Sequence, residues 1–168
     1  MTIHNFEKSN AFAGQHELYA ERLYRKMFPG DCEIIRDRAR QRAGADVRIN
    51  SNGRVIHIEE KIRKKKYPDF FLEYFSAKEY DTPGWIEKDL LCDYLSYICT
   101  EDGCVDILPF ALLRHAWKRK GNEWKTVYGE VHVHNYGPNT RYTTVGVCVP
   151  KQIVWSEISR PFQKIGAP

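Results

Sequence analysis

The chain has 168 residues, of which 42% are hydrophobic and 13% aromatic, and its formal net charge is +4. These values exclude a disordered chain and predict one folded domain, residues 1–168, with its own hydrophobic core. No segment approaches the roughly 20 consecutive apolar residues of a membrane helix, and the N-terminus lacks the apolar stretch of a secretory signal. The five irregularly spaced cysteines indicate free thiols, so we expect a cytoplasmic protein with no membrane partner.

The N-terminal third is expected to form a helix followed by a β-hairpin. Apolar side chains at helical spacing predict an amphipathic helix over Ala11–Phe28, which a Pro-Gly pair ends. Cys32–Arg36 is expected to be a short strand. Two further strand-like runs, Ala45–Asn50 and Arg54–Ile62, are joined through Ser-Asn-Gly, which is a strong hairpin signal.

The rest of the chain is expected to mix strands and helices. In chain order we expect a strand, a helix opened by Pro-Gly, a strand, a helix ending at Gly121, two strands, and a last short helix. These elements cover Asp69–Ser76, Trp85–Cys99, Val105–Phe110, Ala111–Lys120, Lys125–Tyr136, Tyr142–Pro150 and Ile153–Ile158. The layout predicts an α/β fold with a central mixed sheet flanked by helices, followed by a strand-rich C-terminal elaboration over residues 111–168.

The second arm of the hairpin carries charge where packing residues are expected. Because strand residues alternate between faces, Glu59 and Lys61 share one face with His57. Glu60 lies on the other face, together with three isoleucines. Antiparallel pairing across the turn brings Asp46 of the first arm close to Glu59 and Lys61. Two converging carboxylates suit Mg²⁺ or Mn²⁺, and a neighbouring ammonium would position water and stabilise negative charge.

These residues resemble the motif of the PD-(D/E)xK nuclease superfamily, whose core is restriction-endonuclease-like. In that motif an acidic residue on one strand is followed, across a hairpin, by Asp/Glu-x-Lys on the next. Asp46, Glu59 and Lys61 occupy these positions, and the resemblance covers about residues 11–110. It implies a Mg²⁺- or Mn²⁺-dependent hydrolase of DNA phosphodiester bonds. In it, Asp46 and Glu59 would be metal ligands, the Glu60 backbone carbonyl an additional ligand, and Lys61 the water-positioning group.

Many members of this superfamily also use a glutamate on the helix before the sheet. Glu17 is the preferred residue for that role here, and Glu21, one turn later, is the alternative. The chain departs from the family pattern in having Ala45 where a proline often precedes the first acidic residue. A literal Pro-Asp occurs at Pro68, but no lysine follows the next glutamate, so we interpret it as the start of a strand. Downstream segments are similar to those of small phage and prophage proteins, a likeness that identifies no substrate.

Two basic clusters flank the hairpin. They comprise Arg36, Arg38, Arg40 and Arg42 before it, and Arg63, Lys64, Lys65 and Lys66 after it. Clusters of this kind suit a phosphate backbone, so they predict DNA binding that weakens as the salt concentration rises. Either cluster taken alone is equally well interpreted as a solvated loop.

The hairpin motif also has a structural interpretation, because Glu-x-Lys on an exposed strand face is commonly a salt bridge. The alternative function is therefore a non-catalytic module on the same fold that binds nucleic acid or a protein. His132 and His134 have a spacing that suits zinc, but the sequence offers no evident third ligand. The sequence does not decide whether the substrate is DNA or RNA, whether cleavage is endonucleolytic or exonucleolytic, or whether the protein is a monomer or a homodimer.

Overall fold

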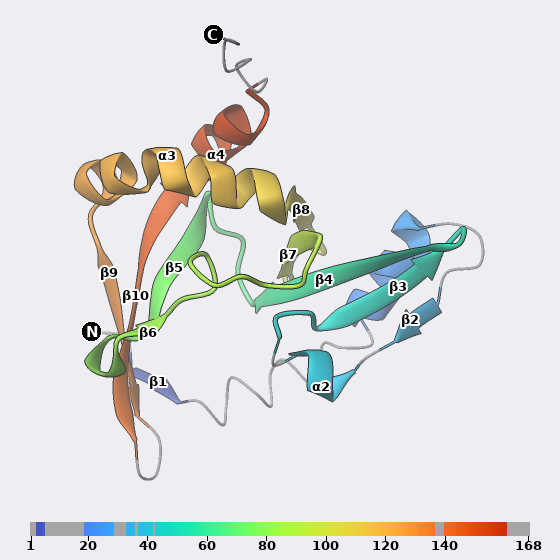
Figure 1. Ribbon diagram of the computed structural model, residues 1–168, viewed down its shortest axis with the longest axis horizontal. Helices are drawn as coiled ribbons and strands as arrows, with labels where there is room; N and C mark the ends of the chain where they lie inside the picture. The colour runs from blue at the N-terminus through green and yellow to red at the C-terminus, as the bar shows by residue number, and fades with distance from the viewer. Residues whose placement is uncertain are drawn as a thin grey trace, which may run out of the picture.

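The computed structural model describes residues 3–5, 19–28, 33–35, 37–41, 43–136 and 140–160. Within these ranges the chain has a mixed α/β fold built on two five-stranded sheets (Figure 1). No helix in the described ranges is both long enough and apolar enough to cross a membrane. The predicted α/β class is therefore confirmed, whereas the single central sheet is replaced by two sheets.

The first sheet contains the predicted hairpin. In sheet order its strands are β2 (Glu33–Ile35), β3 (Val47–Ser51), β4 (Arg54–Arg63), β7 (Tyr94–Cys99) and β8 (Val105–Pro109). All neighbours pair antiparallel except β4 and β7, which are parallel. The turn residues Asn52 and Gly53 have φ of 51° and 75°, the left-handed conformation that a two-residue hairpin turn requires. The predicted hairpin is confirmed, and in it Ser51 pairs with Arg54 and Val47 with Ile58.

One face of this sheet is covered by a helix over residues 19–27. Ala20 and Tyr24 of this helix are fully buried in a cluster with Val47, Ile49 and Ile58. The described part agrees with the predicted amphipathic helix, whose first residues lie outside the described ranges. Since Ile58 faces the helix, Glu59 and Lys61 face the opposite side of the sheet.

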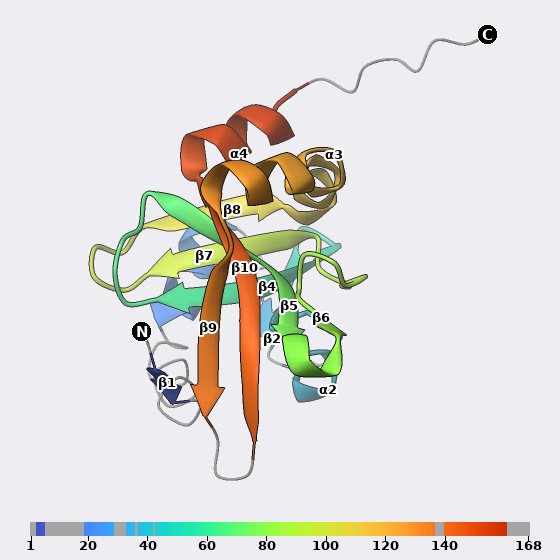
Figure 2. The same ribbon diagram turned by 90° about the vertical axis from the view of Figure 1, so that its left-hand side faces the viewer.

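The second sheet and three further helices complete the described part of the fold. In sheet order the strands are β1 (Ile3–Asn5), β9 (Val131–Tyr136), β10 (Arg141–Pro150), β5 (Asp69–Ala77) and β6 (Thr82–Pro83). The helices are α2 (Arg38–Gln41), α3 (Phe110–Tyr128) and α4 (Lys151–Ile158), with a short 3₁₀ turn over Lys78–Tyr80. The long β9–β10 hairpin runs down from α3 and α4, and β1 adds to its outer edge (Figure 2).

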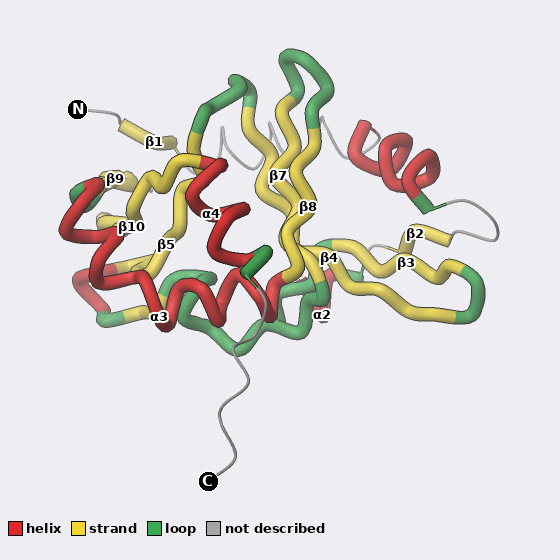
Figure 3. The backbone as a smooth tube through the Cα atoms, turned by 90° about the horizontal axis from the view of Figure 1, so that it is seen from above, coloured by secondary structure: helices red, strands yellow, loops and turns green. Residues whose placement is uncertain are grey.

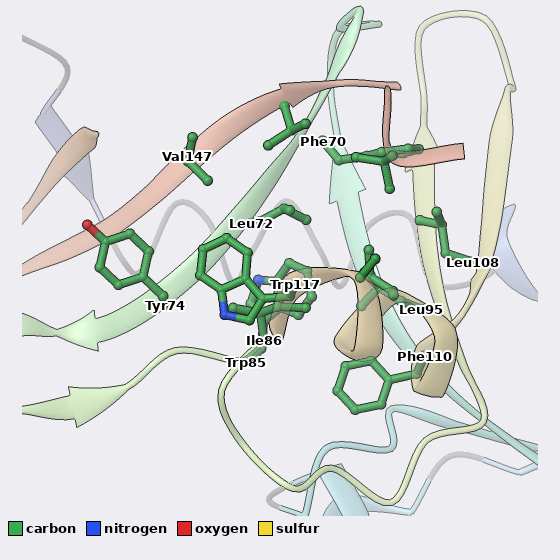
Figure 4. Packing of buried hydrophobic residues seen from close by; sticks show 14 of the residues in the cluster. Phe70, Leu72, Tyr74, Trp85, Ile86, Leu95, Leu108, Phe110, Trp117 and Val147 are labelled. Atoms are coloured by element: carbon green, nitrogen blue, oxygen red, sulfur yellow. The ribbon is translucent and has the colours of Figure 1, made fainter. Parts of the chain in front are cut away.

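The main core lies between the two sheets and α3. Phe70 and Leu72 of β5 meet Leu95 of β7, Leu108 of β8 and Trp117 of α3, and all five are at most 4% exposed (Figure 4). Burying each such side chain contributes roughly 1.5–3 kcal/mol to folding. This core holds β5 of the second sheet against β7 of the first, where the rings of Phe70 and Tyr97 lie 5.0 Å apart.

One predicted helix is wrong, and the predicted end of another is wrong. The segment Trp85–Cys99, predicted as a helix, is irregular at first and then becomes strand β7. From Leu95 to Cys99 every residue is buried, so the apolar run has no strand alternation and resembles a buried helix. The helix predicted to end at Gly121 continues to Tyr128, because the missing side chain lets the Trp117 ring lie over that glycine.

Gly84 makes a close approach that only glycine permits. A Cβ at this position would lie 2.3 Å from the backbone oxygen of Glu73 on β5, and the Gly84 N–H donates to Tyr74. Because a backbone oxygen cannot swing aside, we expect Gly84→Ala to lower the free energy of unfolding by about 1–3 kcal/mol in urea denaturation. The control Gly53→Asn meets no atom within 4 Å, and asparagine tolerates its φ of 75° better than most residues do, so it should lower the free energy of unfolding less than Gly84→Ala does. Equal urea midpoints for the two variants would contradict the expectation.

Candidate functional site

Asp46 joins the two arms of the hairpin at the start of β3. Its backbone N–H donates to the carbonyl of Ile58 over 2.9 Å. Its carboxylate oxygen Oδ2 accepts a 2.7 Å hydrogen bond from the backbone N–H of Glu60. This second bond fixes the carboxylate beside the middle of β4, as the hairpin pairing predicts.

Glu59 and Lys61 lie one pleat apart on the face of β4 that looks toward the second sheet. The Lys61 ammonium donates to Glu59 Oε1 over 2.8 Å. Glu59 is only 9% exposed, and its second oxygen, Oε2, is buried and accepts no hydrogen bond from the described residues. A buried carboxylate oxygen without a donor is costly, so this atom is poised to accept a cation or a water molecule.

The charges of this cluster perturb one another. Burial, together with the neighbouring negative charge of Glu59, raises the pKa of Asp46 to about 7. Burial alone would lower the pKa of Lys61, but the carboxylates of Glu59 and Glu73 raise it above its ordinary value. The ammonium therefore stays protonated, and this one positive charge is shared by the two carboxylates of Asp46 and Glu59.

Glu73 is a member of the cluster that the sequence analysis missed. It lies on β5 and brings a carboxylate from the second sheet toward Lys61. Burial raises the pKa of Glu73, although Lys61 and a hydrogen bond from the Trp85 backbone oppose the rise. The Trp85 ring lies under the Lys61 ammonium, 5.8 Å from it. The available signal in the sequence was Glu73 itself, a charged residue within the aromatic-rich part of β5. No local pattern indicates that it lies near a lysine of the other sheet.

The helical glutamates do not add to this described cluster. Glu17 lies outside the described residues. Glu21 forms a 2.8 Å ion pair with Arg25 on the same helix. That helix covers the Ile58 face of the sheet, so Glu21 lies on the side opposite Glu59.

Glu60 has the position expected of the intervening residue in the motif. Its backbone lies opposite Ser96 of β7, and its N–H binds Asp46. Its side chain belongs to the helix-covered face, with Ile58 and Ile62, and so points away from the cluster. The role of its backbone carbonyl as a metal ligand stays a prediction.

Asp46 and Glu59 fit a hard divalent cation as a pair. Within the part of the chain that the structure describes, no group of three or more His, Cys, Asp or Glu side chains is arranged to hold a metal ion. Mg²⁺ commonly takes one or two carboxylates and fills its other positions with water and substrate phosphate. Two adjacent carboxylates with an unused Glu59 oxygen match that donor set.

The basic cluster after the hairpin divides into structural and exposed residues. Arg63 lies between the rings of Tyr67 and Tyr97, with its guanidinium carbon 5.2 and 4.7 Å from their centres. Lys66 forms a 2.9 Å ion pair with Asp102. Lys64 and Lys65 are exposed at the far end of β4, and neither forms an ion pair within the described ranges. The exposed pair is thus the part of the cluster that solvent reaches and that no described ion pair neutralises.

The basic cluster before the hairpin is described only in part. Arg36 and Arg42 lie outside the described residues. Arg38 and Arg40 belong to the short helix α2, and their side chains are not described. The role of these four arginines in binding DNA stays a prediction.

The two histidines of β9 each have a partner other than a metal. His132 Nε2 lies 3.3 Å from a Glu130 oxygen, and His134 Nδ1 lies 3.1 Å from the hydroxyl of Thr143. Thr143 also donates through its backbone N–H to Glu79 over 2.7 Å. The Thr143–Glu79 bond holds the β9–β10 hairpin to the turn after β5.

Comparison with known proteins yields no match to a family model, to a curated protein or to a solved structure. The functional conclusion therefore depends on the geometry of the Asp46–Glu59–Lys61 cluster.

Proposed function

We propose that this protein is a metal-dependent nuclease of the PD-(D/E)xK type that hydrolyses phosphodiester bonds in DNA. The observation that carries the proposal is the convergence of Asp46, Glu59 and Lys61 on one hairpin, with a buried Glu59 oxygen that has no described donor. The mixed sheet that contains the hairpin is compatible with a restriction-endonuclease-like core, which is part of the same proposal.

Each residue has a role that follows from its contacts. Asp46 and Glu59 would hold Mg²⁺ or Mn²⁺, and the Glu60 N–H keeps the Asp46 carboxylate in place. When bound, the cation supplies Lewis-acid chemistry that polarises the phosphodiester and makes water more acidic. Lys61 is anchored by Glu59, and its other N–H groups would orient water and stabilise charge on the phosphate.

A cleavage panel tests the proposal. Duplex, nicked, single-stranded and branched DNA are incubated with the protein in EDTA, Mg²⁺ or Mn²⁺, and products are resolved by gel. We expect cleavage of at least one substrate with a divalent cation and none in EDTA. Cleavage that persists in EDTA, or no cleavage of any substrate with either cation, would contradict the proposal.

The second candidate is a non-catalytic module that binds nucleic acid or a protein. It is favoured by one observation, the 2.8 Å ion pair between Lys61 and Glu59, which suits a structural salt bridge on the strand. DNA binding without cleavage of any substrate would support this candidate. Cation-dependent cleavage would exclude it.

Nucleic-acid binding should depend on the exposed lysines after β4. Replacing Lys64 and Lys65 together by glutamine removes two charges that we expect to contact phosphates. The slope of log binding constant against log salt concentration should therefore fall in magnitude by about 2. Fluorescence anisotropy with labelled duplex DNA, in EDTA to prevent cleavage, measures this slope. Lys26→Gln, an exposed lysine on the helix over residues 19–27, is the control, and an equal effect from it would contradict a specific role for the β4 end.

A further inference from the structure

Two cysteines face each other where β7 and β8 join, away from the Asp46–Glu59 pair. Cys99 is the last residue of β7, and Cys104 immediately precedes β8. The Cys99 N–H donates to the Cys104 carbonyl over 2.8 Å, and the Gly103 N–H donates to the Cys99 carbonyl over 3.1 Å. With Gly103 at a φ of 72°, this is a bulge in which two residues oppose one.

Both thiols project from the same face of the sheet. The adjoining pair, Ile98 and Val105, lies opposite in register and packs toward the helix over residues 19–27. Alternation along each strand therefore directs Cys99 and Cys104 to the other face. The 2.8 Å bond from the Cys99 N–H to the Cys104 carbonyl makes the two residues cross-strand neighbours beside the bulge. Cross-strand neighbours have Cα atoms about 4.5–5.5 Å apart, which is within the range of a disulfide.

The same two thiols hold the basic loop between β4 and β5. Cys99 Sγ donates to the carbonyl of Lys64 over 3.7 Å, and the Lys66 ammonium donates to Cys104 Sγ over 3.4 Å. The Asp102 carboxylate forms an ion pair with Lys66, and Lys66 together with the two thiols lowers the pKa of Asp102. The two sulfur atoms thus converge on one carboxylate and one loop (the β4–β5 and β7–β8 connections lie together in Figure 3).

We propose that Cys99 and Cys104 form a reversible thiol–disulfide pair, oxidised by peroxide, whose reduced state holds the basic loop in place. Cys104 is exposed and reacts first, whereas Cys99 is 8% exposed and resolves the product. In the first step the Cys104 sulfur attacks the O–O bond of hydrogen peroxide, forming an S–O bond and releasing water. In the second step Cys99 sulfur displaces the oxygen, forming the S–S bond and releasing a second water.

Oxidation would change the contacts of the loop. A disulfide removes the thiol proton that Cys99 donates to Lys64, and it redirects the Cys104 sulfur from the Lys66 ammonium toward Cys99. The loop would then keep its backbone bonds to Thr100 and Glu101 but lose both sulfur contacts. The consequence for DNA binding through the exposed Lys64 depends on the proposed function, whereas the disulfide itself does not.

Peptide mapping tests the pair directly. The full chain is treated with hydrogen peroxide, its remaining thiols are alkylated, and it is digested with a protease that cuts before aspartate. This digestion separates Cys99, on Asp93–Glu101, from Cys104, on Asp102–Val105. We expect these two peptides to be joined in the oxidised protein and separate after dithiothreitol.

Limited trypsin digestion should cut the loop between β4 and β5 several-fold faster in the oxidised protein, because two of the loop's contacts are lost.

Three variants distinguish the outcomes. Cys99→Ser should leave a Cys104 sulfenic acid that dimedone traps, Cys104→Ser should leave Cys99 reduced, and Cys148→Ser should form the disulfide like the wild type. Linked peptides whose loop is cut at the unchanged rate would overturn the coupling to the loop. Absence of linked peptides, or a Cys104 that reacts no faster than Cys148, would overturn the pair. None of these readouts requires nuclease activity, so failure here and failure of the proposed function are distinguishable.

Discussion

Replacing Asp46 by asparagine is expected to stabilise the cation-free protein at pH 8 by about 1–3 kcal/mol. The pKa of Asp46 is raised from 3.8 to about 7, first by burial and then by the charge of Glu59. The folded state therefore binds more protons than the unfolded state between these pH values, so stability falls as the pH rises through that window. One pKa unit corresponds to about 1.4 kcal/mol, and solvent relaxation around this partly exposed side chain reduces the full value.

The stabilisation by Asp46→Asn should depend on the pH and on the presence of the cation. It should be largest above pH 7 and shrink as the pH falls toward 4, because the wild-type carboxyl becomes neutral in the folded protein. The asparagine oxygen can still accept the Glu60 N–H, so the backbone contact is kept. Mn²⁺ should stabilise the wild type by mass action and leave the variant nearly unchanged.

Thermal unfolding at several pH values, with and without Mn²⁺, measures both effects. Asp81→Asn is the control, because Asp81 is exposed and its φ of 51° is one that asparagine adopts readily. This control should change neither stability at pH 8 nor the response to Mn²⁺. A variant Asp46→Asn that is no more stable than the wild type at pH 8, or equally stabilised by Mn²⁺, would contradict the cation site.

The largest effect on activity is expected from Lys61→Gln, which should reduce DNA cleavage by about 10²–10⁴-fold. Removing the ammonium removes the positive charge that pairs with Glu59 over 2.8 Å, beside the proposed reaction site. Glutamine keeps a donor for Glu59, so the change tests charge more than shape. DNA affinity in EDTA should change far less than the cleavage rate, because Lys61 would act mainly in the transition state.

The control for this variant is Lys120→Gln, which breaks a 2.6 Å ion pair with Glu123 on the exposed side of α3. Such a surface pair contributes about 0–1 kcal/mol, and its loss should leave cleavage unchanged. Circular dichroism and thermal unfolding establish that both variants are folded. A folded Lys61→Gln protein that cleaves at the wild-type rate would restrict Lys61 to a structural role.

The hairpin could be predicted from sequence because its signals are local. The Asn-Gly turn sets the register of β3 and β4, and the register in turn sets which side chains share a face. Asp46, Glu59 and Lys61 therefore lie together with no contribution from distant packing. The same reasoning correctly separates Glu60 from them.

The division of the strands into two sheets could not be predicted in the same way. The partner of β4 on its far side is β7, whose buried apolar residues have no strand alternation and resemble a helix. The approach of Glu73 to Lys61 depends on how β5 packs across the core, between residues distant in the sequence. Long-range packing of this kind leaves no periodic signal in the sequence. Neither the division into two sheets nor the approach of Glu73 to Lys61 could therefore be predicted from it.

The most direct test of the account is where Mn²⁺ binds. In an amide NMR spectrum of the isotope-labelled protein, a bound Mn²⁺ broadens the signals of nearby residues. The account predicts that Asp46, Glu60 and Lys61 broaden first in the wild type, and that this broadening is lost in Glu59→Gln but retained in Glu123→Gln. Broadening centred elsewhere, or unchanged in Glu59→Gln, would contradict a cation site on the hairpin.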